Sequence, residues 1–266
     1  MNNNQDSIVK TDPWKQLKSY TNARIAIGRV GSSLPTSEVL NFGFAHAMAR
    51  DAVHLALDVD ALALRLEVQG VHTVRVHSKA PDRASYLLRP DWGRRLDEKS
   101  LEFLESVKRQ KNRDSIDLLI VIGDGLSSLA ITRHVEPLIQ EIKSLVPLNW
   151  NISPVVIASQ ARVALGDEIG QLLNAKMVAM FIGERPGLSS PDSLGIYLTY
   201  NPKLGLSDAD RNCISNVRPE GLQYADAAKK LIWLAKEAMR LKLSGVVLKD
   251  ESEMREISQQ TTLESK

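Results

Sequence analysis

The sequence predicts an α/β protein built on a parallel β-sheet. Three apolar runs, at Asp117–Gly123, Pro154–Ser159 and Lys176–Gly183, alternate with helical patterns in the second part of the chain. Such runs are too continuous for strands with one exposed face, and strands covered by helices on both faces are connected in parallel by right-handed crossovers. The alternation therefore predicts a Rossmann-like domain. The first ninety-odd residues have a mainly helical pattern, and we expect them to form a smaller domain that precedes it.

The region before Asp97 contains one strong helical pattern. After Leu34-Pro35-Thr36, which suits a helix start, apolar residues recur at intervals of three and four. They are Val39, Phe42, Ala45, Ala49, Val53 and Ala56. This spacing predicts an amphipathic helix whose apolar face packs internally. Alternating residues in Val71–Ser78 predict a short, half-exposed strand. We place a domain boundary near Asp97, so that residues 1–96 form the helical domain.

The second domain is expected to span residues 97–248. A helix follows the first apolar run, and Pro137 inside it should cause a kink or a break because proline lacks an N–H donor. A short helix is expected at Asp167–Asn174 and a long one at Ala225–Leu243, each from its helical spacing of apolar residues. The polar and charged residues 249–266 are expected to form a mobile tail.

Composition excludes several classes of function. With 266 residues and 43% hydrophobic side chains, the chain can bury one sizeable core. Its net charge of +2 creates no field that would imply a nucleic acid or an anionic membrane as the partner. A single cysteine forms no internal disulfide and offers no zinc framework, which fits a reducing cytoplasm. Met1–Lys10 lacks an apolar signal region, and no apolar run approaches the roughly 20 residues of a membrane span. We therefore expect a soluble intracellular protein.

Three loops at the carboxyl ends of the predicted strands are candidate ligand sites, because small molecules bind at this edge of an open parallel sheet. Gly123-Asp124-Gly125 lacks the third glycine of a dinucleotide motif, and the next strand ends in Ser159-Gln160 rather than in an acid that binds a ribose. Two glycines that permit a tight turn explain this loop better. Gly28–Ser33 lacks the lysine of a phosphate-binding loop. Neither pattern favours a nucleotide enzyme.

The other two loops carry Val163 and Glu184, and a polar segment further along carries Cys213. Glu184 at the end of a buried strand requires an ion pair, for example with Arg185, or a ligand with N–H and O–H donors. Val163 is either a core residue or a contact to the apolar edge of a large ring. Cys213 is either a buried small hydrophobic residue or a reactive thiol. Because the sequence places no histidine near it, covalent catalysis is disfavoured.

Eight segments with distinctive sequences occur in a fixed order along the chain. They are Asp12–Trp14, Ala23–Thr36, His46–His54, Tyr86–Leu96, Val121–Ile131, Arg162–Gly170, Gly183–Gly195 and Arg211–Asn216. Together they resemble the small subunits of adenosylcobalamin-dependent ethanolamine ammonia-lyase. The resemblance implies a carbon–nitrogen lyase that converts ethanolamine to acetaldehyde and ammonia by a radical mechanism. It also implies adenosylcobalamin as the cofactor, a large subunit that holds the substrate, and no activity of this chain alone.

The resemblance carries three site residues onto this chain by motif. They are Val163, Glu184 and Cys213, all as cobalamin contacts, with no catalytic residue. A histidine that replaces the cobalamin base lies in Asp-x-His-x-x-Gly, and neither His46 nor His54 has that setting, so we expect no cobalt ligand from this chain.

The residues say less about the partner subunit and the cellular location than about the fold. Trp14 and Trp92 lie beside loop residues and are either structural or contacts to the partner subunit. The resemblance implies a location in the bacterial cytoplasm and leaves open enclosure in an ethanolamine-utilisation microcompartment. A free-standing nucleotide enzyme and a purely structural assembly subunit remain the rival functions.

Overall fold

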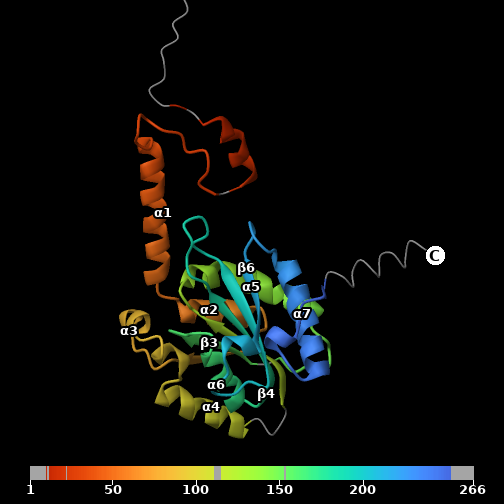
Figure 1. The fold of residues 1–266 in the computed structure, drawn as a ribbon. Coiled ribbons are helices and arrows are strands. Elements are labelled where there is room, and N and C mark those ends of the chain that lie inside the picture. Colours follow the sequence, from red (N-terminus) through yellow and green to blue (C-terminus); the bar gives the residue numbers. More distant parts are fainter. Residues whose placement is uncertain (1–9, 11, 22, 111–114, 153, 253–266) are drawn as a thin grey trace, which may run out of the picture.

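The computed structural model describes residues 10, 12–21, 23–110, 115–152 and 154–252. Its centre is a six-stranded sheet with the order β1-β3-β2-β4-β5-β6 (Figure 1). The strands are β1 Thr73–His77, β2 Ile116–Gly123, β3 Val155–Ser159, β4 Ala175–Gly183, β5 Leu194–Tyr200 and β6 Arg211–Val217. The helices are α1 Thr36–His54, α2 Val59–Val68, α3 Arg83–Leu88, α4 Glu98–Gln110, α5 Ser128–Leu145, α6 Leu165–Leu172 and α7 Tyr224–Leu241. Short 3-10 helices are η1 Pro13–Tyr20, η2 Trp92–Arg94, η3 Asp208–Asp210 and η4 Gly245–Val247. The chain is therefore α/β, as the sequence predicts.

Only part of the sheet is parallel, which corrects the prediction of a parallel sheet throughout. Strands β1, β3, β2 and β4 pair in parallel, whereas β5 and β6 are added in antiparallel fashion. After β4 the chain returns through residues 184–193 and places Leu194 opposite Gly183. Because this connection contains no helix, the chain reverses direction as a hairpin instead of crossing over the sheet. Neither β5 nor β6 follows from the sequence pattern above.

Helices cover the two faces of the sheet unequally. Helices α2, α5 and α7 share one core with the strands, to which they contribute Leu66, Val135 and Leu231. Helices α4 and α6 share a second core on the other face, with Leu104 and Ile169. On that second face α6 lies over β4 and α4 contacts β1. The described helices therefore leave part of the second face of β5 and β6 open, around Tyr197 and Cys213.

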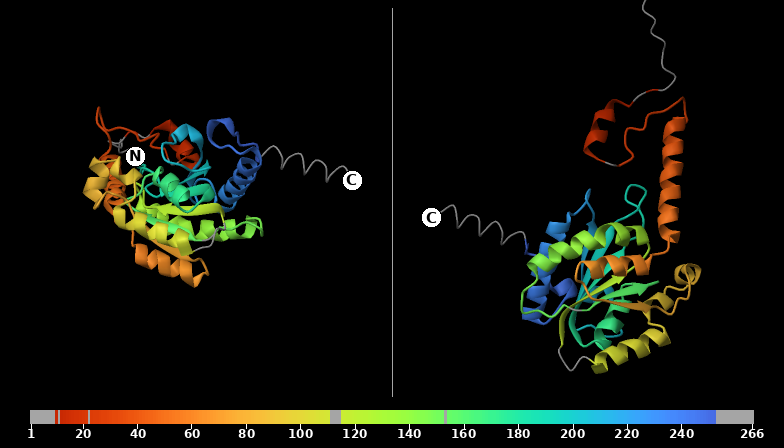
Figure 2. Two further views of the ribbon diagram at one scale, coloured as in Figure 1. Left: turned by 90° about the horizontal axis from the view of Figure 1, so that it is seen from below. Right: turned by 180° about the vertical axis from the view of Figure 1, so that it is seen from behind.

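Helix α1 stands away from the sheet (Figures 1 and 2). The predicted helix is present, but of its side chains only Ala45 and Ala52 are buried. Large apolar side chains are exposed at Val39, Leu40, Phe42, Phe44 and Met48. They are spread around the helix rather than along one stripe, so packing on the sheet could not bury them all. The expectation of an internal packing face is therefore wrong, and these side chains are open to another chain.

The single sheet bears on the predicted domain boundary. Strand β1 lies before Asp97, yet it pairs with β3 in the common sheet. Residues on both sides of the boundary therefore build one sheet, which weighs against the division into 1–96 and 97–248. That division stays a prediction.

The later helices follow the sequence closely. Helix α5 runs through Pro137 as one element, so the chain is not broken there. Helices α6 and α7 confirm the short and the long helix that were expected. Most of the predicted tail, 253–266, lies outside the described residues. Within the described ranges, no helix has the length and apolar character that crossing a membrane requires.

Candidate functional site

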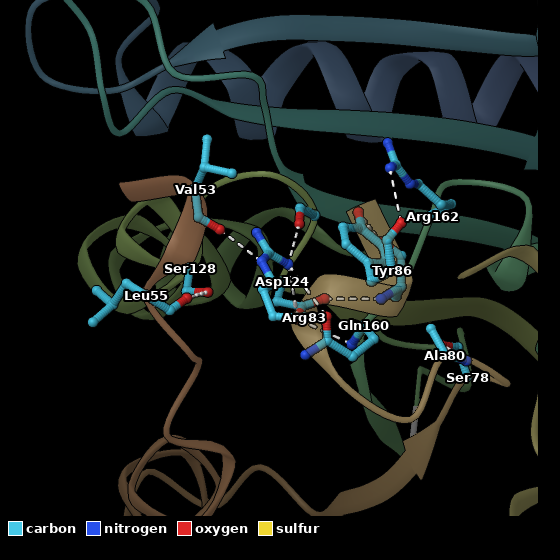
Figure 3. Close-up of polar contacts among 12 residues, drawn as sticks. Val53, Leu55, Ser78, Ala80, Arg83, Tyr86, Asp124, Ser128, Gln160 and Arg162 are labelled. Atoms are coloured by element: carbon cyan, nitrogen blue, oxygen red, sulfur yellow. Dashed lines mark hydrogen bonds and ion pairs between the residues drawn. The ribbon is translucent and has the colours of Figure 1, made fainter. Parts of the chain in front are cut away.

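The carboxyl edge of the parallel strands is held together by Asp124, in the turn after β2. Its carboxylate is buried and accepts hydrogen bonds from Gln160 N at 2.9 Å and Ala161 N at 2.8 Å, in the loop after β3 (Figure 3). The guanidinium of Arg83 lies 3.5 Å from the same carboxylate. Because these protein groups occupy Asp124, it serves to position the neighbouring loop rather than to bind a ribose.

Tyr86 and Arg162 fix the same loop from the side of α3. The Tyr86 hydroxyl donates to Ala161 O at 3.0 Å, and Arg162 N donates to Gly93 O at 2.7 Å. The Arg162 guanidinium lies 4.3 Å from the centre of the Tyr86 ring, within cation–π range. Burial raises the pKa of Tyr86, so its hydroxyl stays protonated and remains a donor. The loop is thus tied down by the protein before it presents Val163.

The glycines of the turn after β2 allow this turn to contact the loop after β4. Gly125 has a positive φ of 57°, and a Cβ at this position would overlap the carbonyl of Gly183 after β4. Leu126 N donates to that same carbonyl at 2.9 Å. This close approach supports the interpretation of Gly123-Asp124-Gly125 as a tight turn, with glycine required where side chains do not fit.

Glu184 follows β4, and one of its carboxylate oxygens has no partner among the described residues. Its Oε2 accepts from Ser193 Oγ at 2.5 Å and from Asn216 N at 3.4 Å. Its Oε1 lies over Gly195, where an added Cβ would be only 2.9 Å away. Arg185 is exposed, and no ion pair to Glu184 occurs in the part of the chain that the structure describes. Of the two alternatives for this residue, the geometry favours an acceptor that is free to bind a donor.

Tyr197 and Cys213 lie opposite each other on β5 and β6. Partial desolvation raises the pKa of Tyr197, and the nearby Cys213 and Glu184 raise it further. Desolvation also raises the pKa of the Cys213 thiol, and Glu184 and Asp208 add to this although a hydrogen bond with Tyr197 opposes it. Cys213 is nevertheless exposed as a residue, so it is not a buried core side chain. Its thiol is neutral at neutral pH, which disfavours a nucleophile.

Val163 lies in the loop between β3 and α6, two residues before the helix begins. It is partly buried and packs against the same core as Tyr197. It also lines a cavity of about 510 Å³ together with Arg211 of β6, two residues from Cys213. The structure therefore brings the three predicted residues to one surface, which we call the β5–β6 face. It comprises Val163, Glu184, Gly195, Tyr197 and Cys213.

The β5–β6 face offers binding groups rather than catalytic ones. It contains one free carboxylate oxygen, a neutral thiol, a neutral phenol and a valine. A general acid–base pair requires groups whose pKa values are set near the working pH, and both shifts seen here move away from neutrality. Tyr197 was missed from the sequence, although the alternation of Ile196, Tyr197 and Leu198 is the signal of a half-buried strand.

Helix α1 is anchored at the same edge of the sheet. Arg83 Nε donates to Val53 O at 2.6 Å, and Ser128 Oγ donates to Leu55 O at 2.6 Å (Figure 3). Arg83 also reaches Gly125 O at 2.8 Å, so one guanidinium joins the end of α1 to the turn after β2. The exposed helix is therefore continuous with the edge that carries Val163 and Glu184.

Comparison with known proteins gives the family. A family model described as Ethanolamine ammonia-lyase light chain (EutC) matches residues 11–249. An ethanolamine ammonia-lyase small subunit from Pseudomonas syringae pv. tomato is 50% identical over 266 residues, which cover 100% of this chain and 92% of that relative. The chain belongs to the ethanolamine ammonia-lyase light-chain family. A small subunit from Pseudomonas fluorescens is 52% identical, and one from Pseudomonas putida is 54% identical. Both alignments cover 96% of this chain, and they cover 93% and 94% of the two relatives, respectively.

Membership confirms the resemblance that the eight segments carry. The chain is a small subunit of an ethanolamine ammonia-lyase, and a small subunit implies a lyase complex with a large-subunit partner.

Proposed function

We propose that the β5–β6 face is this chain's half of an adenosylcobalamin site, completed by the large subunit, which holds ethanolamine. The observation that carries the proposal is the free Oε1 of Glu184, which lies over Gly195 on the same face as Val163 and Cys213. A half-buried carboxylate oxygen without a partner favours a ligand that brings hydrogen-bond donors.

The residues of the face fit the chemistry of cobalamin. Its corrin ring carries a fringe of primary amides, whose N–H groups match the acceptor at Glu184. The apolar edge of a large ring matches Val163, and the neutral side chains of Tyr197 and Cys213 add surface without charge. When bound, the coenzyme supplies the radical chemistry that converts ethanolamine to acetaldehyde and ammonia. This chain's residues bind and orient the ring and exclude water.

The topology of the sheet supports this placement. Strand β2 lies between β3 and β4, and the crossover helices α5 and α6 pack on opposite faces. In Rossmann-like sheets ligands bind beyond the carboxyl ends of the strands, where the strand order reverses. Val163 follows β3 and Glu184 follows β4, on either side of that point. The Rossmann-like description of the parallel strands belongs to this proposal.

Helix α1 forms part of the proposed interface with the large subunit. Its large apolar side chains are exposed around the helix, and exposed apolar surface of this extent marks a protein-interaction surface. The helix is anchored beside the coenzyme site, and Arg24 ahead of it donates to Leu188 O at 3.3 Å, in the loop that follows Glu184. A partner that completes the coenzyme site therefore lies next to this helix. Trp14, whose side chain is exposed, belongs to the same region.

The rival functions are less well supported. A nucleotide enzyme would use the turn after β2, but the carboxylate of Asp124 is occupied by two backbone N–H groups. A purely structural role of the subunit does not explain the unpaired carboxylate oxygen of Glu184. We assign no cobalt ligand and no catalytic residue to this chain, so it is inactive alone. We place the assembled enzyme in the bacterial cytoplasm, either free or enclosed in an ethanolamine-utilisation microcompartment.

Co-expression with the large subunit tests the proposal. Ammonia release from ethanolamine should require both chains and added adenosylcobalamin, and equilibrium dialysis should show tight cobalamin binding only to the complex. Ammonia release by the isolated chain, or a complex that binds no cobalamin, would refute it.

A further inference from the structure

A cavity of about 510 Å³ adjoins the β5–β6 face at Val163. It lies between η2, the start of α6 and the loop Leu204–Asp208, and four arginines line it. They are Arg94, Arg95, Arg162 and Arg211. We call it the arginine cavity. Its volume lies within the range of small-molecule sites.

Two of these four arginines are already neutralised by carboxylates. Arg95 pairs with Glu168, with 2.9 Å between Nη2 and Oε1. Arg211 is buried and pairs with Asp167 and, at 3.0 Å, with Asp208. These pairs join two arginines to three carboxylates and build the wall of the cavity, so they contribute no positive charge to it.

The other two arginines are not neutralised within the described residues. Arg94 is exposed, and its guanidinium has no ion-pair partner there. Arg162 is stacked on Tyr86, and its Nε is buried without a hydrogen-bond partner. A buried donor that lacks an acceptor is costly, so this nitrogen favours an anionic or strongly accepting ligand. The arginine cavity thus carries an uncompensated positive charge next to the proposed corrin surface.

We infer that the arginine cavity binds the phosphodiester of the cobalamin nucleotide loop. This inference rests on the proposed function, because the nucleotide loop is covalently joined to the corrin that the β5–β6 face would hold. Arginine guanidinium groups recognise phosphate oxygens through paired N–H donors and keep their charge at every physiological pH. Val163 lines the cavity and belongs to the face, so ring and loop can be held at once. Free phosphate and nucleotides share this chemistry, and the test separates them.

The test compares two corrinoids, one with and one without the nucleotide loop that contains the phosphodiester. Hydroxocobalamin carries the nucleotide loop, and cobinamide has the same corrin without it. Equilibrium dialysis measures both dissociation constants on the assembled two-subunit complex, with the wild-type chain and with Arg94→Ala. The variant should bind hydroxocobalamin about tenfold to a hundredfold more weakly, as expected for a lost hydrogen bond between charged groups. Its affinity for cobinamide should be unchanged.

Controls make the outcomes distinct. Arg240→Ala, in an exposed pair on α7, removes the same side chain from the other face of the sheet and should change neither affinity. Arg94→Lys keeps the charge but loses the paired donors, and should also weaken only hydroxocobalamin binding. An equal loss for both corrinoids would overturn the inference while leaving the proposed function intact. A wild-type complex that binds neither corrinoid would overturn both. Binding of adenosine monophosphate as tight as that of hydroxocobalamin would show a nucleotide site instead and overturn the inference.

Discussion

The turn after β2 and the β5–β6 face lie on the same edge of one sheet, but they differ in how far their polar groups are paired within the protein. Around Asp124 the carboxylate accepts hydrogen bonds from two backbone N–H groups and pairs with Arg83, so its partners come from within the protein, although Arg83 Nη2 is left without a hydrogen-bond partner. On the β5–β6 face, the Oε1 of Glu184 has no partner within the part of the chain that the structure describes, and Cys213 is exposed.

The difference separates a scaffold from a binding surface. A buried hydrogen-bonded network holds one geometry, and removing a member leaves its partners unpaired. Polar groups that lack a protein partner on a rigid sheet contribute little to folding stability, but they can bind a ligand without rearranging. Substitutions in the first region should therefore change stability, whereas substitutions in the second should change binding.

The largest effect is expected for Asp124→Ala. It leaves Arg83 and the N–H groups of Gln160 and Ala161 without their acceptor, so the free energy of unfolding should fall by about 3–5 kcal/mol. Urea unfolding of the isolated chain, followed by circular dichroism, measures this. Asp226→Ala, which removes an exposed carboxylate 3.9 Å from Lys229, is the matched control and should have little effect. A stable Asp124→Ala chain would show that the network is not the scaffold.

The next largest effect concerns α1. Leu40→Asp combined with Phe44→Asp places two charges on side chains that are 67% and 70% exposed, so the isolated chain should fold normally. Affinity for the large subunit should fall at least about a hundredfold, because burying each of these side chains contributes roughly 1.5–3 kcal/mol. Sedimentation velocity with the large subunit measures this.

Leu148→Asp, at an exposed leucine between α5 and β3, serves as the control for that pair and should leave assembly unchanged. Undiminished assembly of the double variant would exclude α1 from the interface. Self-association of the wild-type chain that the double variant abolishes would indicate instead that a second copy covers the helix.

A smaller and more selective effect is expected for Glu184→Gln. The change keeps the shape of the side chain but removes the charge, so coenzyme should dissociate about tenfold to a hundredfold more readily from the complex. The KM for ethanolamine at saturating coenzyme should not change, since we propose that the large subunit holds the substrate. Glu220→Gln, at an exposed carboxylate beyond β6, is the control. Equal losses in coenzyme and substrate affinity would mean that Glu184 is merely structural.

The smallest effect is expected for Cys213→Ser. Turnover of the assembled enzyme should be largely retained, because we propose that the thiol is a coenzyme contact, and its raised pKa disfavours a nucleophile. The raised pKa of Cys213 gives a second readout. Alkylation requires the thiolate, so its rate in the isolated chain should rise with pH through a midpoint above that of a free cysteine measured in parallel. A midpoint below that of free cysteine, or an inactive variant that still binds coenzyme, would contradict this assignment.

Much of the parallel half of the fold could be predicted from the sequence, since strands buried on both faces give continuous apolar runs. The antiparallel strands could not, because β6 alternates buried residues such as Ile214 with exposed ones such as Cys213, and this weak pattern resembled a polar loop. The sequence predicted the position of helix α1 correctly, but it did not predict that the apolar side chains of the helix are exposed. Periodicity shows that a face is apolar, and it does not show which chain covers it.

The candidate site divides in the same way. Glu184 and Val163 lie at strand ends, where the rule for parallel sheets places ligand loops, and the residues could be proposed on that ground. Cys213 was carried over only by family resemblance, and Tyr197 was not considered. Both lie on an antiparallel strand pair whose existence depends on the long connection after β4, which local propensity does not specify.

The central claim is that the β5–β6 face is covered by cobalamin in the assembled enzyme. Cys213 is the single cysteine of the chain, so iodoacetamide labelling followed by mass spectrometry reports on that face alone. In the complex of both subunits, saturating adenosylcobalamin should slow the alkylation of Cys213 at least about tenfold relative to the coenzyme-free complex. Equal rates with and without bound coenzyme would contradict the account.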